Sequence, residues 1–250
     1  MYTLKKFDGR AEDYTTGRPG YAQELIEYLY TRFGISDESV IADIGSGTGK
    51  FARYLLDRGS EVYCVEPNPD MRHVAERELN GYTNFHSVIG TAENTMLETG
   101  SVDYITVAQA FHWFDVASFR QECRRIMKKQ GTVFLVWNAR IPEDAFNQEV
   151  QKLNTIYCPN FKGFNGGIKK DDQRIREFFC GDYDYRTFDN PLFLDRGKFI
   201  ARCLSSSYSL KEGDAGYEQY LKAMNEVFDQ YEKNGIVSIA NQSVVYIGKV

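Results

Sequence analysis

The middle of the chain alternates between short continuous apolar runs and segments in which apolar residues recur every three or four positions. A continuous run is typical of a strand buried on both faces, and the wider spacing is typical of a helix that covers such strands. The alternation therefore predicts an α/β fold, with helices on both faces of a parallel sheet. Five strands are predicted, over residues 40–44, 61–65, 84–89, 102–108 and 132–137.

Helical spacing predicts the elements between and around these strands. Asp115 is a typical N-cap residue. Gly34 and Gly131 follow the expected ends of two helices, where glycine is common. Helices are expected over residues 21–33, from Phe51 to a stop at Gly59, from about Asp70 to Leu79, and from Asp115 to Lys129.

The pattern weakens beyond residue 138. Two helices are expected over residues 146–157 and 217–231, and strand regions over 183–193 and 237–250. The mixed charge run 169–177 is expected to be a solvated face.

Length, charge and cysteine content restrict the class of protein. A chain of 250 residues is expected to form one large domain or a core with an elaborated cap. Its 30 Lys and Arg against 35 Asp and Glu give a net charge of −5, with both signs interspersed. This charge pattern offers no basic surface for nucleic acid or an anionic membrane. The five scattered cysteines include no C-x-x-C pair, so neither a disulfide framework nor a metal site is indicated.

The hydropathy of the chain predicts its location. No stretch approaches the roughly 20 consecutive apolar residues of a membrane span. The N-terminal residues M-Y-T-L-K-K-F-D lack the apolar segment of a secretion signal. We therefore expect a cytoplasmic protein without a membrane partner.

A glycine-rich segment, D-I-G-S-G-T-G at residues 43–49, stands where the first strand becomes a helix. Glycines there allow a tight turn and close approach of a ligand, and the N–H groups that open the helix attract negative charge. The segment does not match either of two common nucleotide-binding patterns. The dinucleotide pattern G-x-G-x-x-G would need glycine at Lys50, and the phosphate loop G-x-x-x-x-G-K-[ST] would need glycine at Ile44 and a hydroxyl at Phe51.

Glu66 closes the second strand, 23 residues beyond Asp43. Ligands of open parallel sheets lie outside the carboxyl ends of the strands, where an acidic side chain can accept hydrogen bonds from ribose hydroxyls. An exposed carboxylate is the alternative, but the glycine loop at this spacing favours a nucleoside site.

Successive motifs of the chain resemble those of class I S-adenosylmethionine-dependent methyltransferases. The subgroup that the chain is most similar to is the type 11 small-molecule kind, which includes trans-aconitate methyltransferase-like proteins. The resemblance covers about residues 7–137, including Phe7, Asp8, Tyr14, Arg18, Pro19 and Tyr21 near the N-terminus. The motifs are D-I-G-S-G-T-G at 43–49, V-E-P at 65–67, G-T-A-E at 90–93 and S-V-D-Y-I-T-V-A-Q-A-F-H-W-F at 101–114.

This resemblance implies a doubly wound, Rossmann-like sheet of seven mostly parallel strands, with a helical lid or insertion in the C-terminal part. Residues 1–34 would form an N-terminal segment and helix over the cofactor, and residues 35–140 the α/β core that binds it. Residues 141–250 would supply the lid, the substrate region and the final strands.

The resemblance also implies roles in binding S-adenosylmethionine. Asp43 would hold the amino-acid end of the cofactor, Glu66 its ribose, and Pro67 and Met71 the adenine, although core packing is an alternative for Met71. The full set of implied cofactor residues is Arg18, Asp43, Gly45, Ser46, Gly47, Gly49, Glu66, Pro67, Met71, Ala92, Glu93, Gln109 and Ala110. Of these, Ala92 and Glu93 would meet the polar edge of adenine, and the backbone of Gln109 and Ala110 would border the donor methyl, with core packing again an alternative for Ala110.

Methyl transfer from a sulfonium needs alignment of donor and acceptor rather than a nucleophilic residue or a metal. His112 is the candidate general base, and a structural or pocket-lining histidine is its alternative. Arg18 could instead bind an acidic acceptor or lie on the surface. The candidates for the acceptor pocket are Tyr14, Tyr21, Phe111 and Trp113, with core packing an alternative for Phe111.

The leading hypothesis is a small-molecule O-methyltransferase with a carboxylic acid as candidate acceptor and S-adenosylhomocysteine as product. Alternatives are C- or N-methylation of a quinone or amine precursor, and a protein that binds the cofactor without catalysis. The segment N-P-L-F at residues 190–193 differs in place from the N-P-P-[YF] motif of nucleic-acid methylases and is interpreted as a turn beside a strand. We expect a monomer or homodimer without a nucleic-acid partner.

Overall fold

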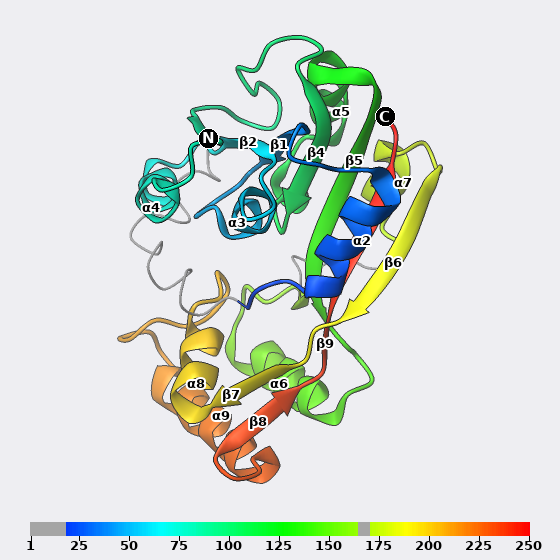
Figure 1. Cartoon of the computed structure of the whole chain (residues 1–250). Helices are drawn as coiled ribbons and strands as arrows, with labels where there is room; N and C mark the ends of the chain where they lie inside the picture. The colour runs from blue at the N-terminus through cyan, green and yellow to red at the C-terminus, as the bar shows by residue number, and fades with distance from the viewer. Residues whose placement is uncertain (1–18, 165–170) are drawn as a thin grey trace.

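A computed structural model describes residues 19–164 and 171–250. Figure 1 shows these residues as two lobes, an upper lobe around a long twisted sheet and a lower lobe made mainly of helices. The candidate site residues Tyr14 and Arg18 lie outside the described residues, so their roles stay predictions.

The upper lobe contains a seven-stranded sheet, as predicted. Its strand order is β3-β2-β1-β4-β5-β9-β6, and β1 to β5 pair in parallel. Only β9 runs antiparallel to its two neighbours, β5 and β6. The bounds are β1 Val40–Ile44, β2 Glu61–Val65, β3 Phe85–Val88, β4 Val102–Ala108, β5 Met127–Arg140, β6 Tyr183–Asp189 and β9 Asn241–Gly248.

Helices cover both faces of this sheet because the strands are apolar on both sides. Ile41 belongs to the core on one face, whereas its neighbours Ala42 and Ile44 belong to the core on the other. The first core is completed by α2 (Gln23–Phe33), α3 (Lys50–Leu56) and α4 (Pro69–Leu79), and the second by α5 (Val116–Ile126) and α7 (Gln173–Phe178). Because β1 is the parallel neighbour of both β2 and β4, the carboxyl ends of these three strands meet at one edge of the sheet.

The lower lobe has a separate apolar core. It is built from α6 (Ala145–Tyr157), β7 (Leu192–Asp195), α8 (Arg196–Leu204), α9 (Tyr217–Tyr231) and β8 (Ile236–Ile239). The chain enters this lobe after β5 and again after β6, and returns to the sheet through β9 (Figure 1). None of the helices in the described part of the chain combines the length and the apolar character needed to cross a membrane.

Several predicted boundaries differ from the structure. The helix that starts at Asp115 ends at Ile126, because Met127 already pairs with Val102 in the sheet. The expected strand region 183–193 is divided between two sheets, with Asn190 and Pro191 at the turn. The charged run is not solely a solvated face, since Ile175 in α7 is fully buried against the sheet. Helix α8 was not predicted.

Candidate functional site

The glycine loop joins β1 to α3 in a compact turn. The N–H groups of Gly45 and Ser46 both donate to the carbonyl of Val65, at 2.8 and 3.3 Å, which ties the loop to the end of β2. A Cβ on Gly45 would lie 2.7 Å from Cβ of Ala110, and one on Gly49 would lie 2.5 Å from Cδ1 of Leu79. A Cβ on Gly47 would meet nothing within 4 Å. Gly45 and Gly49 thus allow close packing, whereas Gly47 faces open space.

Glu66 lies beside this open turn. Its Oε2 accepts a hydrogen bond from the N–H of Gly47 at 2.9 Å, and its Oε1 accepts one from the N–H of Asn68 at 2.8 Å. Burial raises the pKa of the Glu66 carboxyl, and the two N–H groups oppose that shift. These two hydrogen bonds fix the Glu66 side chain in place. Each carboxylate oxygen has a further lone pair, which can accept a hydrogen bond from a hydroxyl group.

Asp43 lies beneath the loop rather than on an exposed wall. Its side chain is fully buried, and its Oδ1 accepts a hydrogen bond from the hydroxyl of Thr106 at 2.8 Å. Its Oδ2 has no hydrogen-bond partner among the described residues. Desolvation raises the pKa of Asp43 to about 7. The role of this carboxyl toward the amino-acid end of a cofactor stays a prediction.

The predicted adenine residues follow β2 and β3. Asn68 caps α4 by accepting a hydrogen bond from the N–H of Met71, whose side chain is buried. Ala92 is buried in the second core, whereas Glu93 is exposed and accepts a hydrogen bond from the N–H of Asp115 at 3.0 Å. Glu93 is therefore engaged with the start of α5. Pro67 is partly buried at the turn into α4.

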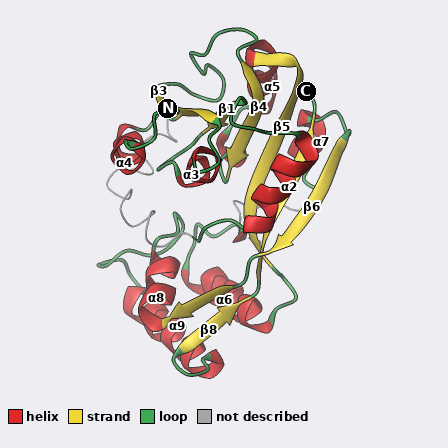
Figure 2. Ribbon diagram, in the orientation of Figure 1, coloured by secondary structure: helices red, strands yellow, loops and turns green. Residues whose placement is uncertain are grey.

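A cavity of about 510 Å³ lies between the two lobes. Figure 2 shows loops of both lobes facing one another at this level. The cavity is lined by seven of the predicted site residues, which are Tyr21, Gly45, Ser46, Gly47, Gln109, His112 and Trp113. Other lining residues from the upper lobe are Pro19, Thr48, Lys50, Phe51, Ala108, Asn138 and Arg140, and those that follow α6 or lie in and after α8 are Asn160, Lys162, Gly163, Phe164, Arg202 and residues 205–208.

Gln109 turns the chain sharply where β4 meets this cavity. Its φ of 62° is in the left-handed region, which residues other than glycine seldom adopt. The turn is held by a hydrogen bond from the N–H of Gln109 to the carbonyl of Val136 at 2.9 Å. Ala110 follows and packs against Gly45. This backbone thus lies next to the glycine loop, and its role in bordering a donor methyl stays a prediction.

The aromatic candidates separate into two groups. His112 and Trp113, in the short 3₁₀ helix η2 (Phe111–Trp113), line the cavity, as does Tyr21. Phe111 instead lies in the second core, with its ring centroid 5.2 Å from that of Phe178 and 6.3 Å from that of Trp137. The structure therefore gives Phe111 a packing role rather than a place on the cavity wall.

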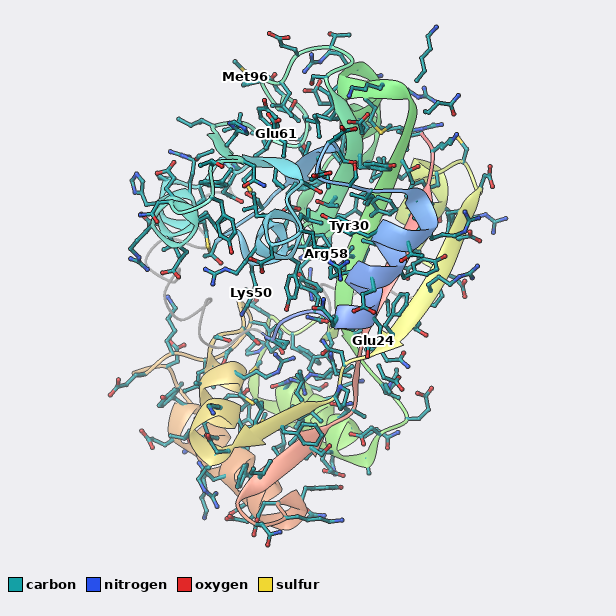
Figure 3. The ribbon with its side chains drawn as sticks, viewed as in Figure 1. Glu24, Tyr30, Lys50, Arg58, Glu61 and Met96 are labelled. Carbon is teal, nitrogen blue, oxygen red and sulfur yellow. The ribbon has the colours of Figure 1, made fainter. Side chains whose placement is uncertain are left out.

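Four cationic side chains of the cavity were missed by the sequence reasoning. They are Lys50, Arg140, Lys162 and Arg202, and none of the described residues that line the cavity is Asp or Glu. Figure 3 labels Lys50 at the edge of the upper lobe that faces the lower lobe. These residues come from four separate segments, so only the fold brings them together.

The two parts of the site suit different chemistry. Gly47 offers an open backbone cradle and Glu66 a fixed acceptor for hydroxyls, and the buried Oδ2 of Asp43 has no hydrogen-bond partner within the described part of the chain. These residues fit a cationic nucleoside such as S-adenosylmethionine. The adjoining cavity suits an anion. Within the described residues, no cluster of three or more His, Cys, Asp or Glu could hold a metal ion.

Comparisons with known proteins agree with this geometry. A family model described as a methyltransferase domain matches residues 42–135. An uncharacterized methyltransferase of Mycobacterium bovis is 38% identical over 127 residues, which is 51% of this chain and 49% of the relative. An uncharacterized methyltransferase of Schizosaccharomyces pombe is 32% identical over 188 residues, covering 75% of this chain and 70% of the relative. The chain thus spans about half the length of the first relative and more of the second.

The fold is also found among solved structures. A protein from Anaeromyxobacter dehalogenans, assigned as a type II methyltransferase, has a TM-score of 0.68 at 18% identity, covering 93% of this chain and 97% of that one. At this identity the likeness concerns the fold, which agrees with the seven-stranded sheet described above. From the family match and the coverage of the relatives, the chain belongs to the S-adenosylmethionine-dependent methyltransferases with a type 11 methyltransferase domain.

Proposed function

We propose that this protein transfers a methyl group from S-adenosylmethionine to an oxygen atom of a small carboxylic acid, with S-adenosylhomocysteine as the second product. The observation that carries the acceptor class is the cavity beside the glycine loop, which is lined by four cationic side chains and by no described carboxylate. The chain as a whole has a net charge of −5, so these cavity residues are opposite in sign to the protein's overall charge.

The glycine loop and Glu66 support the proposed cofactor. Glu66 would accept hydrogen bonds from the ribose, and Gly47 would let the backbone approach the ligand closely. When bound, S-adenosylmethionine supplies a methyl group on a sulfonium, which an acceptor oxygen attacks as the neutral thioether leaves. The residues of this chain have to bind both molecules and align them, since alignment provides most of the rate enhancement that such a reaction requires.

The cationic cavity supports an acidic acceptor. A carboxylate is ionised at pH 7 and already carries a nucleophilic lone pair, so its methylation needs no general base. His112 and Trp113 line the cavity beside Gln109 and would orient the acceptor there. We therefore favour an orienting role for His112 over proton abstraction.

Two measurements test the proposal. Calorimetric titration with S-adenosylmethionine and S-adenosylhomocysteine should give binding, and labelled methyl groups should pass to members of a carboxylic acid panel as alkali-labile esters. Failure of both nucleosides to bind would remove the cofactor assignment. Transfer to amines or carbon acids instead of carboxylates would retain the methyltransferase but overturn O-methylation.

A matched pair of variants locates the ribose contact. Glu66→Gln should weaken S-adenosylhomocysteine binding by about 1–3 kcal/mol, because a buried charge-assisted acceptor is lost. Glu61→Gln, at the opposite end of the same strand, is the control, since Glu61 contacts Tyr63 and His86 and is partly exposed. Equal affinities for the two variants would contradict the role of Glu66.

A further inference from the structure

Asp43 lies between two polar side chains of the neighbouring strands. In the register of the sheet it is paired with Cys64 on β2 and with Thr106 on β4, so the three side chains form a row on one face. All three are buried. The row lies beneath the glycine loop, since Asp43 comes shortly before Gly45, which lines the cavity.

Thr106 supplies the one hydrogen bond that the Asp43 carboxyl accepts within the described part of the chain. The hydroxyl of Thr106 donates to Oδ1 of Asp43 at 2.8 Å, whereas Oδ2 is buried without a hydrogen-bond partner there. The last torsion of an aspartate side chain has a broad minimum, so a hydrogen bond to one oxygen determines where the other oxygen lies. Thr106 therefore fixes the position of Oδ2.

The charges around Asp43 leave its carboxylate without a neutralising group in this row. Burial raises the pKa of Asp43, the hydrogen bond from Thr106 lowers it, and the charge of Glu66 raises it. Burial and the charge of Asp43 raise the pKa of the Cys64 thiol well above its ordinary value, so this thiol stays neutral. A buried carboxylate oxygen without a donor attracts a positively charged group, which it contacts directly or through one water molecule.

We propose that Thr106 is a positioning residue for the cofactor, because its hydroxyl holds the Asp43 carboxylate so that Oδ2 attracts the ammonium group at the amino-acid end of S-adenosylmethionine. This inference rests on the proposed function and adds to it a residue that acts only through Asp43. Thr106 does not line the cavity, so it does not contact the ligand itself. Its effect is confined to one end of the cofactor, whereas Glu66 would serve the ribose.

Calorimetry with three nucleosides tests the inference without requiring turnover. S-adenosylhomocysteine carries the ammonium and carboxylate groups, its decarboxylated form keeps only the ammonium group, and methylthioadenosine has neither. Thr106→Val keeps the shape of the side chain but removes the hydroxyl. We expect this variant to weaken the binding of the first two nucleosides about tenfold and to change that of methylthioadenosine by less than about twofold.

Three further variants assign the effect to the hydrogen bond. Thr106→Ser retains a hydroxyl and should restore most of the affinity for S-adenosylhomocysteine. Adding Thr106→Val to Asp43→Asn should cause no further loss beyond that of Asp43→Asn alone, because the two residues act as a unit. Thr132→Val is the matched control, since Thr132 is a buried threonine on β5 that pairs with Tyr104, and it should bind all three nucleosides as the unmodified protein does.

The pH profile of binding provides a test that does not depend on the folding of Thr106→Val. Because the pKa of Asp43 is raised to about 7, the affinity for S-adenosylhomocysteine should fall as the pH falls below about 7. Protonation of Glu66 would affect the ribose of every probe, so the ratio of the affinities for S-adenosylhomocysteine and methylthioadenosine isolates Asp43. In Thr106→Val the fall of this ratio should move to higher pH, whereas Thr106→Ser should keep the original profile.

The outcomes separate this inference from the proposed function. An equal loss of affinity for all three nucleosides in Thr106→Val would indicate a general collapse of the site and would overturn the positioning role. An affinity ratio that does not change with pH in the unmodified protein would overturn it too, and in both cases the methyltransferase assignment is retained. If S-adenosylhomocysteine does not bind the unmodified protein, the proposed function has failed first.

Discussion

Gly47 and Glu66 connect the glycine loop to the end of β2. The N–H of Gly47 is directed to the carboxylate of Glu66, so the loop after β1 and the end of β2 form one unit. The left-handed backbone of Gly47, with a φ of 57°, is needed for this turn. Its open surroundings distinguish it from Gly45 and Gly49, which approach other side chains closely.

A pair of glycine substitutions separates backbone strain from ligand contact. Gly47→Ala and Gly100→Ala both place a methyl group at a positive φ with no neighbouring atom within 4 Å, so each should lower the free energy of unfolding by about 1–2 kcal/mol. Only Gly47→Ala should weaken the binding of S-adenosylhomocysteine, because only its methyl group enters the proposed cradle. Urea unfolding and calorimetry measure the two effects, and an equal loss of affinity in Gly100→Ala would contradict the cradle.

Helix α5 positions the segment that is predicted to meet adenine. Glu93 accepts a hydrogen bond from the N–H of Asp115 at the start of the helix. One turn before the end of the helix, Glu122 accepts hydrogen bonds from the N–H and hydroxyl of Thr95, at 2.8 and 2.6 Å, and from Arg125 at 2.7 Å. The segment around Ala92 is thereby attached to α5 at two points.

The Glu122 contacts make part of the stability dependent on pH. Hydrogen bonding to Arg125, supported by Thr95, lowers the pKa of Glu122 from 4.5 to about 2. A carboxyl whose folded pKa is below its unfolded value stabilises the protein above the unfolded value, and this stabilisation is lost as the pH falls toward the folded one. The contribution is therefore complete above about pH 5 and disappears toward pH 2.

We expect Glu122→Gln to lower the free energy of unfolding by about 1–3 kcal/mol at pH 7, because the charged acceptor is lost. The difference from the unmodified protein should shrink steadily in urea unfolding curves recorded from pH 5 down to pH 3. Glu98→Gln, in the same loop but exposed, should show no such difference. A difference that is independent of pH would exclude the ionised carboxylate as its source.

At the scale of the whole molecule, the sequence predicted the parts that depend on local pattern. The first five strands and the glycine loop follow from continuous apolar runs and from a motif within seven residues. The division of 183–193 between two sheets could not be predicted, because Tyr185 and Phe193 continue one strand-like pattern while pairing with different partners. The cationic cavity was missed for a related reason, since its charged residues are more than 20 positions apart or separated by an entire lobe.

The junction of the lobes depends on a cluster of polar side chains. Nδ2 of Asn190 donates to the carbonyl of Gly20 at 2.9 Å and to Oδ1 of Asn138 at 3.0 Å. Ser243 donates to the same oxygen of Asn138 at 2.7 Å and accepts from the N–H of Ala22 at 2.9 Å. Residues far apart in the chain therefore meet where β5, β9 and the turn after β6 leave the sheet.

This cluster predicts that Asn190 stabilises the junction rather than taking part in nucleic-acid chemistry. Asn190→Ala removes donors from two acceptors, Gly20 and Asn138, and should lower the free energy of unfolding by about 1–3 kcal/mol. Because Gly20 precedes the cavity residue Tyr21, hydrogen exchange should also accelerate at the start of α2. Asn94→Ala, at an exposed position where the Asn94 backbone makes hydrogen bonds with Thr91, should change neither measurement. An unchanged stability of Asn190→Ala would contradict the stabilising role of the Asn190 side chain at the junction.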